Sequence, residues 1–211
     1  MGKERTRQVK PASIQIIHRG AEAILYLDKG KLVKERISKG YRITELDQKI
    51  RKQRTKGEAK LMERSRGIGL PIPGVGMNGD FRIVMDYIQG KKLKDVLNEM
   101  DQKERAKVCE KIGEMIAGLH ANGIIHGDLT TSNMILKGNE VFLVDFGLGK
   151  FSEKTEDQAV DLFLLYEALK STHFRILGEC WERIVNAYSK HAKAKEVMGK
   201  MEKIKKRRRY K

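Results

Sequence analysis

The sequence predicts an α+β fold of two lobes, in which a sheet-rich first lobe is followed by a helical second lobe. Apolar residues come in short runs broken by glycine and proline up to residue 88, whereas from Leu93 onward they recur at three- and four-residue steps. A chain of 211 residues is long enough to bury a core in one large domain or two small lobes. We therefore expect an N-lobe over residues 1–88, a helical C-lobe over residues 89–191 and a basic tail over residues 192–211, with the hinge near residues 86–90.

The N-lobe begins with three predicted strands. Ile14, Ile16 and Ile17 mark the first strand, which leads into Gly20, and residues 23–27 mark the second. Residues 28–31 read Asp-Lys-Gly-Lys and predict a tight turn into a third strand over residues 32–37. These strands follow one another closely, so an antiparallel arrangement is expected.

One polar helix and further short strands complete the predicted N-lobe. The helix covers residues 44–66, and we expect it to be interrupted or bent near Gly57. The Gly- and Pro-rich residues 67–79 are unsuited to a helix and predict short strands with turns. Residues 81–88 predict one more strand, which ends before Gly90.

Helical spacing dominates the C-lobe. Apolar residues between 93 and 100 mark a short helix, and those between 108 and 119 mark a longer one. A short buried strand is expected at residues 141–144, followed by helices near residues 160–169 and 176–190. From residue 192 on, we expect the tail to extend the last of these helices before it frays.

The charge of the chain is concentrated in two stretches. The formal net charge is +16, of which residues 29–66 contribute +9 and residues 190–211 another +9, while the remainder nets −2. Such stretches suggest a polyanionic partner, either a nucleic acid or a nucleotide phosphate. A solvated surface that keeps the protein soluble is the alternative explanation.

Several classes of protein are excluded at this stage. The two cysteines, Cys109 and Cys180, are far apart and have no metal-binding spacing, so neither a disulfide framework nor a structural zinc site is supported. The N-terminus lacks the apolar core of a signal peptide, and no run of 18 apolar residues exists. We expect a cytoplasmic protein that does not enter the membrane.

The strongest chemical signal is the segment His126–Asn133, which reads His-Gly-Asp-Leu-Thr-Thr-Ser-Asn, together with the later Asp-Phe-Gly that begins at Asp145. Phosphoryl transfer needs a carboxylate that orients the attacking hydroxyl or water, and oxygen ligands for Mg²⁺. Asp128 is the predicted base or orienting residue, and Asn133 and Asp145 are the predicted metal ligands. Loop Asp and Asn residues also cap turns, but two such segments beside apolar strands favour a catalytic role.

Two upstream residues complete this prediction. Lys34 lies on a predicted strand, where it would reach the α- and β-phosphates of ATP. Glu58, on the following helix, is the candidate ion-pair partner of Lys34, and Glu63 is the alternative. Each of these residues is also compatible with an ordinary surface charge.

The nucleotide is expected to contact two further places. Gly20, between the first two strands, would let backbone N–H groups approach the phosphates, although a single glycine is a weak signal. Met85, Asp86 and Ile88 lie where an adenine would meet backbone groups of the hinge, and plain strand packing is the alternative there.

Together these segments resemble the protein-kinase superfamily and, more narrowly, the family of kinase/ATPase subunits of the KEOPS (EKC) complex. The segment His126–Asn133 is a very specific match, and most of the chain takes part in the resemblance. The resemblance implies a bilobal protein-kinase-like fold with a truncated C-lobe, and use of ATP and Mg²⁺. It also implies a cytoplasmic complex that makes threonylcarbamoyladenosine in tRNA. The expected partners are a threonylcarbamoyl transferase subunit of the Kae/TsaD type and a small adaptor on the N-lobe, with tRNA met through the complex.

Departures from ordinary kinases bear on the acceptor of the phosphate. Gly127 replaces the usual Arg, so control by a phosphorylated activation loop is not expected, and Thr130 replaces the usual Lys. The stretch from Asp145 to Asp161 is too short for a peptide-docking activation segment. The acceptor is therefore either water, which makes the protein an ATPase, or a hydroxyl of a bound protein or of the chain itself, which makes it a Ser/Thr kinase.

Three other readings remain as alternatives. Small-molecule kinases of the aminoglycoside or choline type share the His-Gly-Asp motif but need an additional helical subdomain. RIO-type kinases are a second enzyme class and usually carry extra N-terminal domains. An RNA-binding scaffold without required catalysis is the non-enzymatic alternative.

Overall fold

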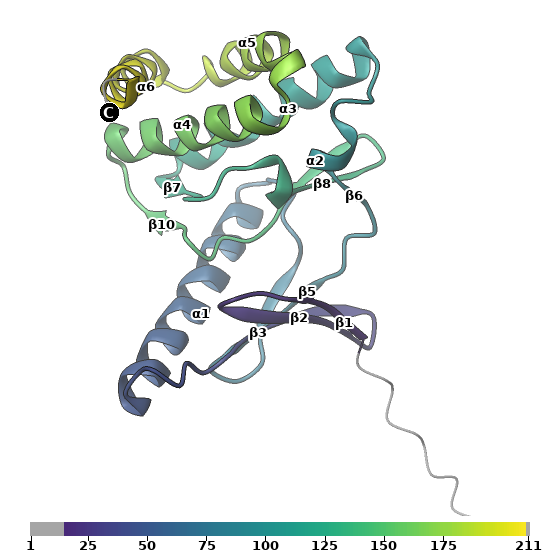
Figure 1. Cartoon of the computed structure of the whole chain (residues 1–211), viewed down its shortest axis with the longest axis vertical. Coiled ribbons are helices and arrows are strands. Elements are labelled where there is room, and N and C mark those ends of the chain that lie inside the picture. The colour runs from purple at the N-terminus through teal and green to yellow at the C-terminus, as the bar shows by residue number, and fades with distance from the viewer. Residues whose placement is uncertain (1–14, 210–211) are drawn as a thin grey trace, which may run out of the picture.

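The computed structural model describes residues 15–209 and confirms the predicted two-lobed α+β architecture (Figure 1). The N-lobe is a five-stranded antiparallel sheet with one long helix, and the C-lobe is mainly helical. Ile14, which we assigned to the first strand, lies outside the described residues. The boundaries that we set at residues 88 and 191 stay predictions.

The N-lobe sheet is built from β1 (Gln15–Arg19), β2 (Ala23–Asp28), β3 (Lys31–Arg36), β5 (Arg82–Asp86) and β4 (Val75–Met77), in that spatial order. All neighbouring strands are antiparallel. The turn between β2 and β3 has Lys29 and Gly30 in the left-handed region, with φ values of 49° and 78°. This conformation matches the twist of a tight hairpin, and glycine adopts it without strain.

Helix α1 (Thr44–Gly67) runs without interruption beside the sheet, so the expectation of an interruption near Gly57 is wrong, while the alternative of a bend there stays a prediction. Glycine in a helix interior is unfavourable by roughly 1 kcal/mol relative to alanine. Packing outweighs that cost, because Thr55, Glu58, Leu61 and Met62 recur at helical spacing and are buried.

The C-lobe contains short strands and four longer helices. Its elements are β6 (Lys91–Lys92), α2 (Leu93–Val96), α3 (Gln102–Ala121), β7 (Ile124–Ile125), η1 (Thr131–Asn133), β8 (Met134–Lys137), β9 (Glu140–Leu143), β10 (Lys150–Phe151), α4 (Thr155–Thr172), η2 (Phe174–Ile176), α5 (Leu177–Tyr188) and α6 (Ala194–Arg209). Strands β6, β8 and β9 form one small sheet, and β10 pairs with β7. The strands β6 and β10 were not predicted, because two-residue strands have no periodic signal.

The C-terminal basic stretch is a separate helix and does not extend α5. Helix α5 ends at Tyr188, and the separate helix α6 begins at Ala194. Helix α6 packs on α4 and buries Ala194, Val197 and Met201 in the hydrophobic core (Figure 1). These three residues are spaced by three and four positions, so one face is apolar although the opposite face is basic.

The fold delivers the predicted chemical residues to the junction of the lobes. The connection from β7 to β8 carries Asp128 and Asn133, and the end of β9 leads to Asp145. Within the described residues, no helix is long and apolar enough to cross a membrane.

Candidate active site

A cavity of about 320 Å³ lies where the N-lobe sheet meets the loops of the C-lobe. Its lining includes Gly20 from the β1–β2 turn, Lys34 from β3, Asp128, and Asp145. These residues are up to 125 positions apart in numbering, and only the closure of one lobe on the other brings them together. The lining also includes Glu22, Arg36 and Arg54, and a cleft that collects three cationic side chains beside carboxylates is suited to a phosphorylated ligand bound with a metal ion.

Lys34 is the centre of an ion-pair network. Its Nζ lies 2.7 Å from Oε1 of Glu58 and 2.7 Å from Oδ1 of Asp145. The predicted pair with Glu58 is thus confirmed as a contact, while Glu63 faces solvent. The second oxygen of Glu58 accepts from Nη2 of Arg36 at 2.5 Å, so this fully buried carboxylate is shared by two cations.

Asp145 has an unusual backbone. Its φ is 63°, in the left-handed region that is costly for a residue with a side chain. The carboxylate accepts from Lys34 and from the backbone N–H of Gly147 at 3.2 Å, which holds this conformation. Burial raises the pKa of the Asp145 carboxyl, but the nearby Lys34 ammonium lowers it further, so that the pKa lies below its ordinary value. Asp145 is therefore ionised at neutral pH.

Asp128 and Asn133 are bonded to each other. The Nδ2 of Asn133 donates to both the carbonyl oxygen and Oδ2 of Asp128, each at 2.9 Å. Because the amide nitrogen is used in this way, Oδ1 of Asn133 stays available as an acceptor or ligand. The loop thus presents one carboxylate and one amide oxygen at fixed relative positions.

His126 supports this loop from within the core. The backbone N–H of Asp128 donates to its Nδ1 at 3.2 Å, and its Nε2 donates to the carbonyl oxygen of Val144 at 3.1 Å. The ring also packs on Phe146, with centroids 4.6 Å apart. Burial lowers the pKa of His126 below its ordinary value, so the imidazole is neutral and connects the Asp128 loop to the segment before Asp145.

Asp161, on α4, anchors the loop that carries Asp128 by hydrogen bonds to its backbone. Its carboxylate accepts from the backbone N–H groups of His126 and Gly127, both at 2.8 Å. Its Oδ2 also lies 3.3 Å from Nε2 of His120, whose Nδ1 is 2.9 Å from the hydroxyl of Tyr188. The carboxylate is fully buried. Three partners compensate for its loss of hydration, and the loop conformation is fixed as a result.

The structure explains why position 127 is glycine. Its φ is 81°, and a Cβ built there would collide with the carbonyl oxygen of Leu148. Any side chain at this position would therefore displace the segment that follows Phe146. The arginine usual at this point in kinases does not fit this geometry.

The structure does not place every predicted residue at the cavity. Gly20, Lys34, Asp128 and Asp145 line it, Glu58 binds Lys34, and Asn133 binds Asp128. The three residues expected at an adenine site, Met85, Asp86 and Ile88, are not among its lining residues.

Met85 and Asp86 have structural contacts instead. Met85 is buried in the core. The carboxylate of Asp86 accepts from Lys31 at 2.7 Å and from the backbone N–H of Gly74 at 2.9 Å. The hydrogen bond from Lys31 holds the pKa of Asp86 below its ordinary value. An adenine-contacting role for these residues stays a prediction.

Sequence reasoning missed the roles of Arg36 and Asp161. Arg36 follows Lys34 by two residues on β3 and so points to the same face of the sheet, which is a signal that the sequence contained. Asp161, followed by Leu162, belongs to the segments that match the family, but its role was missed because its partners are backbone groups far away in sequence.

Comparisons with known proteins found a matching family model and several similar relatives. The family model described as RIO domain matches residues 17–163. The KEOPS complex subunit Bud32 of Pyrococcus abyssi is 41% identical, over 93% of this chain and 96% of that protein. A probable bifunctional tRNA threonylcarbamoyladenosine biosynthesis protein of Methanothermobacter thermautotrophicus is 42% identical over 92% of this chain. The chain spans only 36% of that longer protein.

Two solved structures share the fold. The Rio2 kinase–ADP/Mg²⁺–phosphoaspartate complex from Chaetomium thermophilum has a TM-score of 0.64 at 15% identity and covers 95% of this chain and 72% of that one. The streptomycin–ATP–APH(2")-IIa ternary complex has a TM-score of 0.63 at 14% identity, with 92% and 83% covered. The likeness confirms a protein-kinase-like fold.

Proposed function

This chain belongs to the RIO-domain family and to the same family as the Bud32 subunit, and from that premise we propose that it hydrolyses ATP as the kinase-like subunit of a KEOPS-type complex. In this role it supports threonylcarbamoyladenosine modification of tRNA, the process named for its bifunctional relatives. The RIO-type kinases and the KEOPS subunit, which the sequence alone left as alternatives, do not exclude each other. The chain matches the RIO-domain model over most of its length and also matches the Bud32 subunit.

One observation carries the proposal. Lys34 contacts Glu58 and Asp145 at 2.7 Å each, at a cavity that Asp128 also lines. A scaffold that only bound RNA would have no need for a buried lysine–glutamate pair, since burying charges is unfavourable unless they are closely matched. The pair holds the ammonium at the cavity, where it would meet the phosphates of ATP.

Asp145 at the cavity and Asn133, which is hydrogen-bonded to Asp128, fit a magnesium ion. Mg²⁺ prefers oxygen ligands and is usually held by one or two side chains together with phosphates and water. Asp145 provides an ionised, half-exposed carboxylate, and Asn133 provides an amide oxygen without another hydrogen bond among the described residues. When bound there, the ion would neutralise charge on the phosphate oxygens.

Other residues of the chain bind the phosphates and activate the attacking water. Lys34 holds the phosphates, and Glu58 and Arg36 fix its position from the buried side. Asp128 orients the attacking water and accepts its proton, while Asn133 holds the Asp128 carboxylate in place. The segment between Asp145 and α4 holds only the short strand β10, so no platform for an extended peptide is formed there. Water is therefore the preferred acceptor.

The partners follow from the family. We propose a threonylcarbamoyl transferase subunit of the Kae/TsaD type, a small adaptor on the N-lobe, and tRNA bound through the assembled complex. Membership of a KEOPS complex is supported by the name of the Bud32 relative, whereas the individual partners rest on the resemblance read from the sequence. The cytoplasmic location expected from the sequence stays a prediction.

The proposal is tested by ATP turnover of the purified chain alone, with the transferase, and with transferase and tRNA. We expect turnover to rise with the partners and to be lost in Asp128→Ala, by about 10²–10⁴-fold. The control Asp95→Ala removes an exposed carboxylate on α2 and leaves the rate unchanged. Equal turnover of Asp128→Ala and the wild type would refute the catalytic assignment. Transfer of labelled phosphate to a partner protein, without release of free phosphate, would establish the protein kinase instead.

A further inference from the structure

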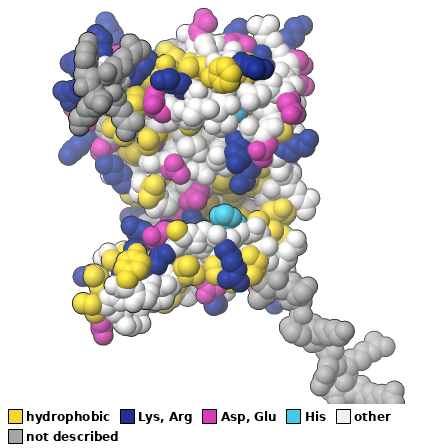
Figure 2. Space-filling model, in the orientation of Figure 1, with side chains coloured by type: hydrophobic (Ala, Val, Ile, Leu, Met, Phe, Trp, Pro, Cys, Tyr) yellow, Lys and Arg dark blue, Asp and Glu magenta, His cyan; other side chains and the backbone are white. Residues whose placement is uncertain are grey.

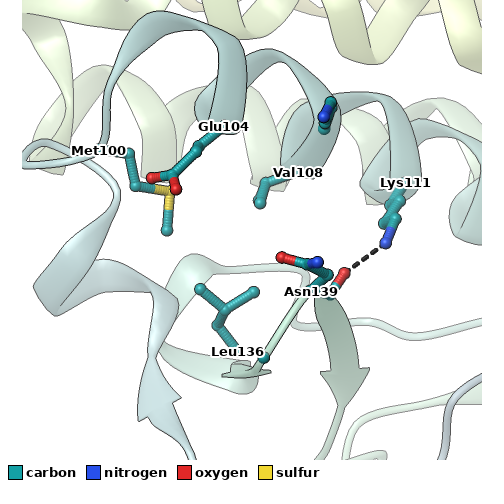
Figure 3. Close-up of a pocket in the computed structure, with 8 residues that line it drawn as sticks. Met100, Glu104, Val108, Lys111, Leu136 and Asn139 are labelled. Atoms are coloured by element: carbon teal, nitrogen blue, oxygen red, sulfur yellow. Dashed lines mark hydrogen bonds between the residues drawn. The ribbon is translucent and has the colours of Figure 1, made fainter.

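A groove on the C-lobe, away from the nucleotide cavity, is lined by α3 and by the hairpin of β8 and β9 (Figure 3). It has a volume of about 400 Å³. Figure 3 shows Val108 and Leu136 facing each other across its centre, Met100 and Glu104 at one end, and Lys111 at the other. The three apolar side chains among these form its floor, and two of them, Met100 and Leu136, are only partly buried.

The lysines around this groove have no acidic partners. Lys103, Lys107 and Lys111 follow one another at four-residue steps on α3, and Lys91 pairs with Leu136 across the small sheet and so shares its face. None of these four lysines makes an ion pair with a described residue. Like charges at four-residue spacing destabilise a helix by a few tenths of a kcal/mol each, and acidic residues three positions away, such as Glu104 and Glu110 beside Lys107, offset part of this cost.

Elsewhere on the surface, some exposed cations are compensated, and others, such as Lys49, Lys56 and Lys94, make no ion pair with a described residue. On α1 the exposed Lys52 and Arg54 pair with Asp80 and Glu22, at 2.8 and 3.0 Å. In the face shown in Figure 2, basic and acidic side chains are interspersed over both lobes. The groove is notable because it combines an apolar floor with lysines that make no ion pair with a described residue.

We propose that this groove docks an acidic segment of a partner protein, with one large apolar side chain of that segment seated on the floor between Val108 and Leu136. The end at Glu104 is itself acidic, so the acidic residues of the partner lie towards Lys107 and Lys111. The stretch of α3 from Glu104 to Lys111 is about 10 Å long, which matches about three residues of an extended peptide. The apolar anchor and the acidic residues are thus close neighbours in the partner sequence.

The lining favours a peptide over a nucleic acid. Single-stranded nucleic acids are bound by aromatic side chains that stack on bases and by arginines that contact phosphates. The groove lining contains neither type, and its floor is aliphatic. Lys111 donates to the backbone carbonyl of Asn139 and so holds the hairpin turn against α3, which closes one end of the groove (Figure 3). Docking there does not depend on the proposed ATP hydrolysis.

The test is a binding assay with the full chain. The probe is a fluorescein-labelled peptide with one leucine followed by a run of glutamates, measured by fluorescence anisotropy. We expect the double variant Lys107→Glu/Lys111→Glu to weaken binding by about tenfold or more. The matched control Lys170→Glu/Lys195→Glu changes the net charge equally at exposed lysines of α4 and α6, and it leaves binding unchanged. Equal binding by the two variants would overturn the proposal.

Two further measurements separate the groove from a general charge effect. A peptide with serine in place of leucine loses about tenfold or more in affinity, because it cannot bury the anchor. Hydrogen exchange of the wild-type chain with the leucine peptide slows at residues 104–111 and 136–139. The absence of this protection, equal binding of the serine peptide, or displacement of the peptide by an oligouridylate that needs the same lysines would each refute the proposal.

Discussion

Removal of the charge of Glu58 is the most direct test of the ion-pair network. Glu58 is 2% exposed and its two oxygens contact Lys34 at 2.7 Å and Arg36 at 2.5 Å. In Glu58→Gln the shape is kept, but one oxygen becomes an NH₂ group that faces a cation. The loss of one partner from a buried ion pair typically destabilises a protein by 3–5 kcal/mol. Asp145 still compensates Lys34, so we expect a loss of about 3 kcal/mol.

The assay is equilibrium unfolding in urea, followed by thermal denaturation. A loss of this size lowers the melting temperature by about 6–12 °C for a chain of this length. ATP turnover falls as well, because Lys34 is no longer held at the cavity. The matched control is Glu63→Gln, which changes an exposed carboxylate on the same helix and alters stability by less than about 0.5 kcal/mol. Equal stability and turnover of the two variants would refute the assigned network.

Other predictions concern the glycines, Asp161, the buried histidines and the basic C-terminal residues. Gly127→Ala lowers the free energy of unfolding, measured in urea, by about 2–4 kcal/mol, because the backbone is strained and the new Cβ collides with Leu148. Gly57→Ala, in the open middle of α1, raises the free energy of unfolding by about 0.5–1 kcal/mol. An unchanged free energy of unfolding in Gly127→Ala would contradict the first expectation. Asp161→Asn leaves buried backbone N–H groups with a weaker acceptor, and it lowers both the melting temperature and ATP turnover. Because burial lowers the pKa values of His126, His173 and His191 in the folded state, the unfolded state binds more protons, and stability decreases as the pH falls below about 6.5. A free energy of unfolding that stays constant across this range would contradict the buried, neutral state of these histidines. The last prediction rests on the basic sequence and the proposed function: replacement of Arg207, Arg208 and Arg209 by alanine weakens the activity or the tRNA affinity of the complex without blocking ATP binding, and a loss of tRNA affinity shrinks as salt rises.

The sequence was most informative where its signals were local. Periodicity predicted the two lobes, and the motif around Asp128 predicted the family, which the comparisons confirm. The turn at residues 28–31 and the candidate pair of Lys34 with Glu58 are also present in the structure. The catalytic and metal-binding roles of these residues stay predictions.

The sequence was least informative where packing overrides local preference. Gly57 predicts a helix break, yet the buried side chains on either side keep α1 continuous. The cations of α6 predict a tail, yet Val197 and Met201 bind the helix to the core, because a single apolar stripe supplies enough buried surface.

Charge shows the division between sequence and tertiary structure most clearly. The sequence by itself determines the net charge, its two dense stretches and the residue types needed for phosphoryl transfer. It does not reveal the lysine row at the groove, because these lysines are diluted among acidic neighbours in a region that nets −2. Only the helix and sheet geometry places Lys107 and Lys111 on one groove with Leu136, whose cross-strand neighbour is Lys91. Electrostatic interactions depend on distance in space, and folding alone sets those distances.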